Sequence, residues 1–112
     1  MRWKLGCAEF LILALVMQVN LLGQAVTGTL LGTVLDPTGA VVPNASVTIT
    51  NEGTGLSDKM TTTAQGFYTF STLTPGQYSL SVETPGFKTT VSRGNVVLVE
   101  QSTRVDITLS PG

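Results

Sequence analysis

The feature that most constrains the fold is a strict alternation of apolar and polar residues in three segments. It runs through residues 45–50 (ASVTIT), 77–83 (QYSLSVE) and 104–110 (RVDITLS). Successive side chains of a β-strand point to opposite faces of a sheet, so each segment has one face for a core and one for solvent. These segments are rich in Val, Thr, Ile and Tyr, which favour strands, and no window beyond residue 25 has helical spacing. The alternation therefore predicts an all-β domain.

Turn motifs separate the alternating segments. Residues 36–39 (DPTG) are typical of a type I turn, whereas 74–77 (TPGQ) and 84–87 (TPGF) place Pro and then Gly at the centre, as in a type II turn. Gly66 and the pair of Gly94 and Asn95 give further breaks. About seven short strands at intervals of about ten residues are typical of a β-sandwich or a barrel. The expected strands are residues 28–35, 45–51, 57–63, 67–72, 77–83, 87–92, 96–100 and 103–109.

The phase of the alternation also predicts which side chains form the core. We expect the core to consist of Val34, Ala45, Val47, Ile49, Tyr68, Phe70, Leu73, Tyr78, Leu80, Val82, Val105, Ile107 and Leu109. The run at residues 96–99 (VVLV) has no polar residue to set a phase. Two interpretations are open for it: a strand that is covered on both faces, or an edge that meets another chain or domain.

The N-terminal 25 residues have the pattern of a secretory signal peptide. A basic start at residues 1–4 (MRWK) precedes an apolar run at residues 10–19, and Gly23 and Ala25 are small residues at the −3 and −1 positions of a cut after Ala25. An apolar run of about ten residues is too short for a membrane anchor, which needs roughly 20. We therefore divide the chain into a signal peptide helix (1–25) and one exported domain (26–112).

Charge and cysteine content exclude several classes of protein. Beyond Ala25 there are four basic and six acidic side chains, a net charge of −2 without a basic cluster, so we expect no nucleic-acid partner. The only cysteine, Cys7, lies within the signal peptide. The domain would thus fold without a disulfide bond, by its hydrophobic core alone.

Several motifs in order resemble the carboxypeptidase regulatory-like domain. They are residues 32–39 (GTVLDPTG), 42–49 (VPNASVTI), 66–70 (GFYTF), 73–78 (LTPGQY) and 86–87 (GF), and the resemblance covers about residues 28–109. It implies a seven-stranded antiparallel Greek-key β-sandwich of the transthyretin-like (prealbumin-like) kind, also grouped with carbohydrate-binding-like folds. Similar domains follow a signal peptide at the N-terminus of TonB-dependent, Oar-like outer-membrane receptors. The resemblance therefore implies an accessory domain in the periplasm or outer membrane of a Gram-negative bacterium. Its membrane contact would come through a receptor barrel beyond this sequence.

The residue types present argue against catalysis. The chain has no histidine, which excludes a Ser-His-Asp triad, a Cys-His pair and the histidine-containing zinc sites of peptidases. Hydroxyisourate hydrolases share the transthyretin fold, but their sites use histidines and a C-terminal Tyr-Arg-Gly-Ser sequence, and this chain has neither. Asp36, Glu52 and Asp58 do not form an acidic cluster with the spacing of a calcium loop. We expect no catalytic residue, no cofactor and no metal.

Binding is the remaining class of function. Sugar sites use exposed aromatic side chains together with a few polar groups. Tyr68, Phe70 and Tyr78 are in phase with the core, whereas Phe67 is out of phase and Phe87 follows a turn. Phe67 and Phe87 are therefore the candidate contacts for a glycan or a protein partner, with packing as the alternative role. The expected partners are a receptor barrel, another envelope protein or a glycan.

Overall fold

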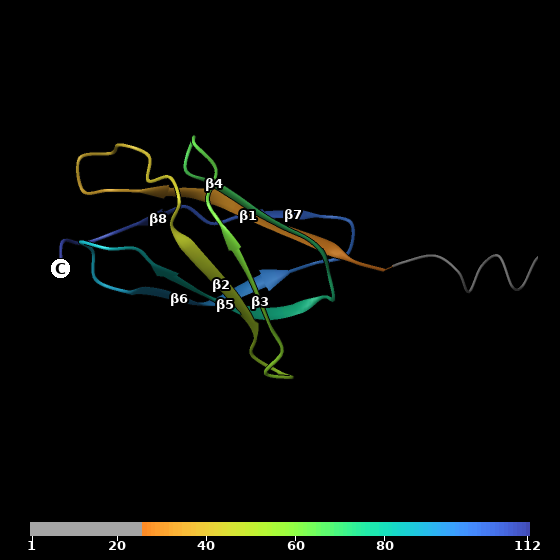
Figure 1. Ribbon diagram of the computed structural model, residues 1–112. Coiled ribbons are helices and arrows are strands. Elements are labelled where there is room, and N and C mark those ends of the chain that lie inside the picture. The colour runs from red at the N-terminus through yellow and green to blue at the C-terminus, as the bar shows by residue number, and fades with distance from the viewer. Residues whose placement is uncertain (1–25) are drawn as a thin grey trace, which may run out of the picture.

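The computed structural model describes residues 26–112, so the predicted signal peptide helix lies outside the described residues. Two sheets face one another, as the alternation predicts, and form a β-sandwich (Figure 1). Within residues 26–112 there are only strands, turns and irregular segments. The strands are β1 (Gly28–Leu35), β2 (Ser46–Asn51), β3 (Ser57–Thr61), β4 (Phe67–Leu73), β5 (Gly76–Glu83), β6 (Thr90–Val97), β7 (Ser102–Arg104) and β8 (Ile107–Thr108).

The first sheet is built on β1, and the second on β2 and β5. The first has the order β4-β1-β7, with β8 also paired to β1, and the second has the order β3-β2-β5-β6. Only the β2–β3, β5–β6 and β7–β8 connections stay within one sheet, so the chain crosses repeatedly between the two layers. These crossings bring the apolar faces of both sheets onto one core, as expected for a Greek-key sandwich.

The prediction of an entirely antiparallel sheet is wrong in one place, because β7 and β8 pair parallel to β1. The reason lies in where the chain crosses over. β6 ends beside the start of β1, where an added Cβ on Gly28 would lie 2.1 Å from the carbonyl oxygen of Leu98. The turn from Leu98 to Gln101 therefore places the start of β7 beside the start of β1. From there β7 extends in the same direction as β1, which makes the pairing parallel.

The structure has eight strands rather than seven, and the predicted strand 103–109 is interrupted between Arg104 and Ile107. The N–H of Thr33 donates to Oδ1 of Asp106 at 2.9 Å, so a side chain takes the place of a main-chain acceptor there. The ladder resumes on both sides, with Val105 N donating to Leu31 O and Leu109 N donating to Leu35 O. The segment is therefore divided into β7 and β8.

Another difference concerns Gly94 and Asn95, which were predicted to break the chain between strands 87–92 and 96–100. They lie instead within the single strand β6, where the register with β5 shifts between Tyr78 and Leu80. Gly94 has a φ of 69°, and the Asn95 side chain donates to the carbonyl oxygens of Tyr78 and Ser92. The side-chain amide of Asn95 thus bonds carbonyl groups at the point where β6 has an extra residue. The pair therefore forms a β-bulge and not a turn.

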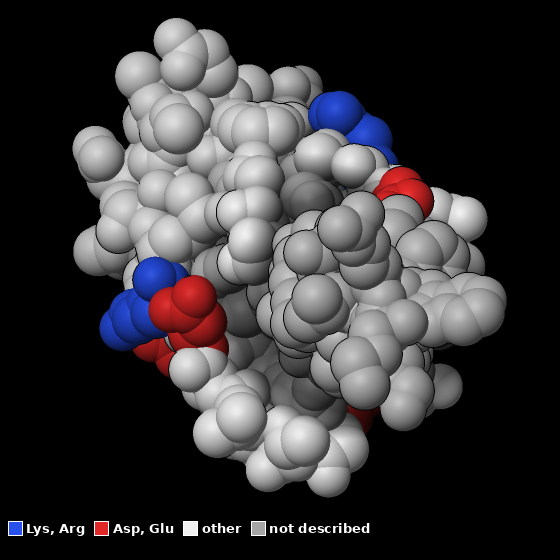
Figure 2. Space-filling model, turned by 90° about the vertical axis from the view of Figure 1, so that its right-hand side faces the viewer, with Lys and Arg blue, Asp and Glu red and all other residues white. Residues whose placement is uncertain are grey.

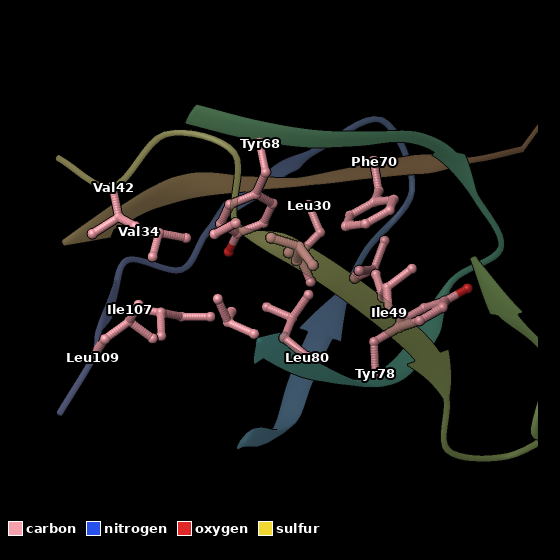
Figure 3. Packing of buried hydrophobic residues seen from close by; sticks show 14 residues of the cluster. Leu30, Val34, Val42, Ile49, Tyr68, Phe70, Tyr78, Leu80, Ile107 and Leu109 are labelled. Atoms are coloured by element: carbon pink, nitrogen blue, oxygen red, sulfur yellow. The ribbon is translucent and has the colours of Figure 1, made fainter. Parts of the chain in front are cut away.

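The core follows the predicted phase closely (Figure 3). Of the thirteen predicted residues, Leu73 and Val105 are only partly buried, and the others are buried. Leu30, Val42 and Val97 are buried as well, although the alternation did not indicate them. The interpretation of residues 96–99 as a strand covered on both faces is wrong: β6 is an edge strand, and Val96, Leu98 and Val99 are exposed whereas Val97 is buried.

A buried polar residue fastens the connection between β1 and β2. The Thr62 hydroxyl donates to Val42 O and accepts from Ala45 N, each at 2.8 Å. Its main chain pairs with Asn44 and Ala45 as well. Thr62 thus satisfies the polar groups of a segment that is partly buried outside any strand.

Gly32 gives the first prediction, because the backbone between β7 and β8 passes close to β1 at this residue. A Cβ added at Gly32 would lie 1.8 Å from the carbonyl oxygen of Val105 and 2.9 Å from the hydroxyl of Tyr68. Gly32→Ala should lower the free energy of unfolding by about 3 kcal/mol or more, since the backbone of the C-terminal segment must move. Urea denaturation measures this. Gly53→Ala is the control in the exposed β2–β3 loop, where the added Cβ would meet only the Asn51 side chain, at 3.3 Å, and it should cost far less. Equal effects of both substitutions would contradict the close approach.

Tyr68 gives a second prediction, on pH dependence. Its hydroxyl donates to Val105 O, and burial, with a further contribution from the charge of Asp106, raises the pKa of Tyr68. The unfolded phenol ionises near its ordinary pKa of about 10, so the folded state retains this proton at a higher pH than the unfolded state does. The stabilisation is complete below about pH 10 and is lost as the pH rises toward the folded pKa.

Tyr68→Phe should therefore cost about 1 kcal/mol at neutral pH and should weaken the decline of stability above about pH 10. Denaturation at a series of pH values measures both effects, and tyrosinate absorbance shows when each of the two tyrosines ionises. An unchanged alkaline decline in the Phe variant would show that another group is responsible.

Candidate functional site

Phe87 lies in the β5–β6 loop, which the C-terminal segment holds in place. Its N–H donates to Thr84 O at 3.3 Å and Gly86 has a φ of 87°, as the predicted type II turn requires. Phe87 forms an isolated antiparallel bridge with Pro111, and Lys88 N donates to Ser110 O. The ring is half-buried and packs against the core, so part of its surface has the predicted packing role.

A hollow of about 430 Å³ opens beside Phe87, on the side of β2 and β3. The pairing of Ser46 with both Thr61 of β3 and Glu83 of β5 brings these strands together here. One aromatic ring thus lies with a carboxylate, an ammonium group and several hydroxyls, which are the groups that bind polyhydroxylated ligands. The lining residues of this Phe87 hollow are Ser46, Lys59, Glu83, Thr84, Pro85, Phe87 and Thr89.

Phe67 lies elsewhere, on the outer face of the first sheet. It begins β4 opposite Thr33 of β1, and it is half-buried while Tyr68 and Phe70 point into the core. Near Thr33, Nε of Arg104 and Oδ2 of Asp106 form an exposed ion pair at 3.2 Å. Arg104 also donates to the Thr33 hydroxyl at 3.3 Å. The polar groups of Arg104 and Asp106 near Phe67 thus already form hydrogen bonds with each other and with Thr33.

The structure does not bring the two predicted aromatic contacts together. Phe67 is absent from the lining of the Phe87 hollow. It lies in β4 of the first sheet, whereas the strand residues that line the hollow come from the second sheet. The companions of Phe87 are residues that sequence reasoning placed only as polar positions, such as Glu83. Finding them requires the register of β2 with β3 and with β5, which the alternation in each strand does not specify.

The acidic residues considered as calcium ligands lie apart and have structural partners. Asp36 accepts hydrogen bonds within its own turn: the Thr38 hydroxyl above all, and also the N–H groups of Ala40 and Thr38, lower the pKa of its carboxyl group. Glu52 accepts from Gly94 N at 3.1 Å, and Asp58 accepts from Lys59 N. In the part of the chain that the structure describes, no three His, Cys, Asp or Glu side chains are placed to hold a metal ion together. Over the same residues there is no helix of the length and apolar character needed to cross a bilayer.

Two sheets with this order, joined by Greek-key crossings and enclosing one core, define the chain as a transthyretin-like β-sandwich. The carboxypeptidase regulatory-like domain family matches residues 29–110, which is most of the sequence. The chain belongs to this family. No curated protein sequence matches it.

Solved structures show where similar folds are found. The Bacillus anthracis TIE protein has a TM-score of 0.66 at 19% identity over 77% of this chain, and a putative carbohydrate binding protein from Bacteroides uniformis has 0.61 at 20% over 74%. The chain spans only 17% and 41% of those two proteins. The 5-hydroxyisourate hydrolase of Klebsiella pneumoniae has a TM-score of 0.57 at 26% identity, over 76% of this chain and 86% of the enzyme. These similarities show the fold.

Proposed function

We propose that the chain is an exported, non-catalytic accessory domain that acts by binding, as the N-terminal domain of a TonB-dependent, Oar-like outer-membrane receptor. The observation that carries this proposal is the match to the regulatory-like domain over residues 29–110, directly after an N-terminal pattern typical of export. The lack of histidine supports a role without nucleophilic or zinc chemistry.

The arrangement of the described ends fits a domain that stands in series with others. β1 begins at one pole of the sandwich, and Gly112 lies at the opposite pole (Figure 1). Gly112 is held there by a hydrogen bond from its N–H to Gly86 O. A receptor domain that followed Gly112 would thus adjoin the β5–β6 loop and leave the other pole free for a partner.

Export gives the direct test. Expressed from Met1 in a Gram-negative host, the protein should be recovered from the periplasm with Val26 as its first residue, as mass spectrometry of the N-terminus will show. Ala25→Tyr should block cleavage, because the peptidase accepts only a small residue there. A conservative Ala25→Ser change is the control and should be processed. Recovery of the unaltered protein from the cytoplasm with residues 1–25 intact would contradict the proposal.

A carbohydrate-binding module is a second candidate, favoured by the Phe87 hollow. Its lining combines one aromatic ring with Lys59, Glu83 and hydroxyl groups. The fold similarity to a protein described as a putative carbohydrate binding protein points the same way. Because that similarity is one of fold, the composition of the hollow is the stronger support.

A glycan array followed by calorimetry tests this candidate. Phe87→Ala and Glu83→Gln should each weaken binding of any retained glycan by about tenfold, which is about 1.4 kcal/mol. Phe67→Ala is the matched control, since it removes the same ring outside the hollow and should leave affinity unchanged. Circular dichroism shows whether each variant is folded. Because loss of the half-buried Phe87 ring can disturb the loop, Glu83→Gln tests the same hollow with a substitution that keeps the size of the side chain. Retention of no glycan would remove this candidate.

A further inference from the structure

Three neighbouring connections form what we call the hairpin pole: the β2–β3 tip (Glu52 to Leu56), the β4–β5 turn (Thr74, Pro75) and the β6–β7 turn (Leu98 to Gln101). In Figure 1 the last two lie at the end opposite Gly112, and the β2–β3 tip projects at the lower edge. Register and hydrogen bonds place them side by side. Glu52 N donates to Gln77 O beside the β4–β5 turn, Gly76 pairs with Val97 before the β6–β7 turn, and Glu100 N donates to Thr27 O.

Exposed apolar side chains are concentrated at or next to the hairpin pole. Leu56 is 75% exposed, more than any other large apolar side chain of residues 26–112. Of the seven exposed large apolar side chains in this part of the chain, Leu56, Leu98 and Val99 belong to this pole, and Val26 and Val96 lie next to it, before β1 and in β6 respectively. Single exposed apolar residues are ordinary, but a group of them at one place marks an interaction surface.

Two adjoining hollows lie within this pole and share Asn51 and Thr74. The first is mainly apolar and measures about 170 Å³; Ile49, Leu56, Leu73 and Tyr78 line it together with Asp58. The second adds Glu52 and Pro75. Neither lining contains a lysine or an arginine. Figure 2 views the molecule from the side on which β1 begins, and the described surface visible there carries both basic and acidic side chains at its margins.

The rim of the apolar hollow is held in a fixed shape. The Tyr78 hydroxyl points away from the other core side chains (Figure 3), donates to Thr74 O at 2.6 Å and accepts from the Asn51 side chain at 3.3 Å. Thr72, also in the lining, has a φ of 57°. A β-branched residue rarely adopts this conformation, and such strain is concentrated at functional sites. The hydrogen bonds of Tyr78 therefore fix the shape of this rim in the folded domain.

We propose that the hairpin pole docks an extended, basic segment of another polypeptide. An apolar side chain of that segment enters the hollow beside Leu56 and Leu73, and flanking Lys or Arg side chains pair with Asp58 and Glu52. Charge complementarity selects this occupant. Asp58 pairs with Ile49 of β2, so the two side chains lie on the same face of the second sheet, as does Met60. Both Ile49 and Asp58 line the apolar hollow. Asp58 and Glu52 each accept one main-chain hydrogen bond on one oxygen, from Lys59 N and from Gly94 N. The second oxygen of each carboxylate is available to a cation at the mouth of the apolar hollow.

The same charges argue against the other occupants of an apolar surface. Glu52, Asp58 and Glu100 would repel anionic lipid headgroups, and in a second copy of this chain they would meet the same three carboxylates. The edge of β6 is a poorer docking site, because the bulge at Asn95 interrupts it and the Thr103 hydroxyl occupies Val96 O. This proposal stands apart from glycan binding, since the Phe87 hollow has no lining residue in common with the hairpin pole.

The test uses residues 26–112, which contain every strand and core residue described. The probe is a blocked peptide of alternating Lys and Leu, added to isotope-labelled protein in an NMR titration. Signals of Leu56, Asp58 and Leu73 should shift. Leu56→Ser and Asp58→Lys should each weaken binding by about fivefold or more, and added salt should weaken it as well. Val41→Ser is the matched control, an exposed valine outside the hairpin pole, and should leave binding unchanged.

Further outcomes separate this proposal from its rivals. A peptide of alternating Glu and Leu should bind at least about tenfold more weakly, because like charges meet at the mouth of the hollow; equal binding would overturn the assignment of a basic partner. Shifts confined to the Phe87 loop, or no shifts, would overturn the site. Binding to phosphatidylglycerol vesicles that Leu56→Ser abolishes would overturn it in favour of a membrane contact. None of these results depends on whether the protein is exported or binds a glycan.

Discussion

The approach of the C-terminal segment to β1 is the constraint on which the rest of the sandwich depends. β1 has a neighbour on each side, β4 on one and β7 with β8 on the other, so it holds the first sheet together. The second contact is possible because Gly32 has no side chain where the backbone of Val105 passes. The Tyr68 hydroxyl, reaching across from β4, then donates to the carbonyl oxygen of Val105. One glycine and one buried phenol thus fix the last strands in a domain whose described residues include no cysteine.

This arrangement determines which parts of the surface remain available. The crossings between the sheets occupy both ends of the sandwich, and the edges of β4 and β6 carry side-chain hydrogen bonds: Thr69 N donates to the sulfur of Met60, and Val96 O accepts from Thr103. Partially satisfied edges are poor templates for adding a strand. Recognition by this domain would then use its loops and poles, as is common where a rigid scaffold positions variable connections.

The sequence predicts the core wherever polar residues set the phase, and fails where they do not. Val47 and Ile49, or Leu80 and Val82, are separated by Ser or Thr, so their burial follows from the two-residue period. Leu30 precedes Leu31, and Val97 lies among apolar neighbours, so the pattern cannot say which one points inward. Gly94 looked like a turn because glycine does mark turns, but a bulge uses the same positive φ within a strand. Parallel pairing of β7 and β8 is a property of the crossover, which local sequence does not encode.

Functional surfaces were harder to predict than the core, for a related reason. Sequence reasoning could select Phe67 and Phe87 because their phase or position makes them available, but it could not say that Lys59 and Glu83 surround only the second. Leu56 carries no periodic signal at all, since it lies between strands, and its exposure becomes meaningful only when Leu73, Tyr78 and Asp58 are beside it. The two poles that result differ in chemistry: one offers a ring among charges and hydroxyls, the other an apolar hollow with carboxylates. Because a single rigid core supports both poles, a domain built in this way can present two binding surfaces of different chemistry at once.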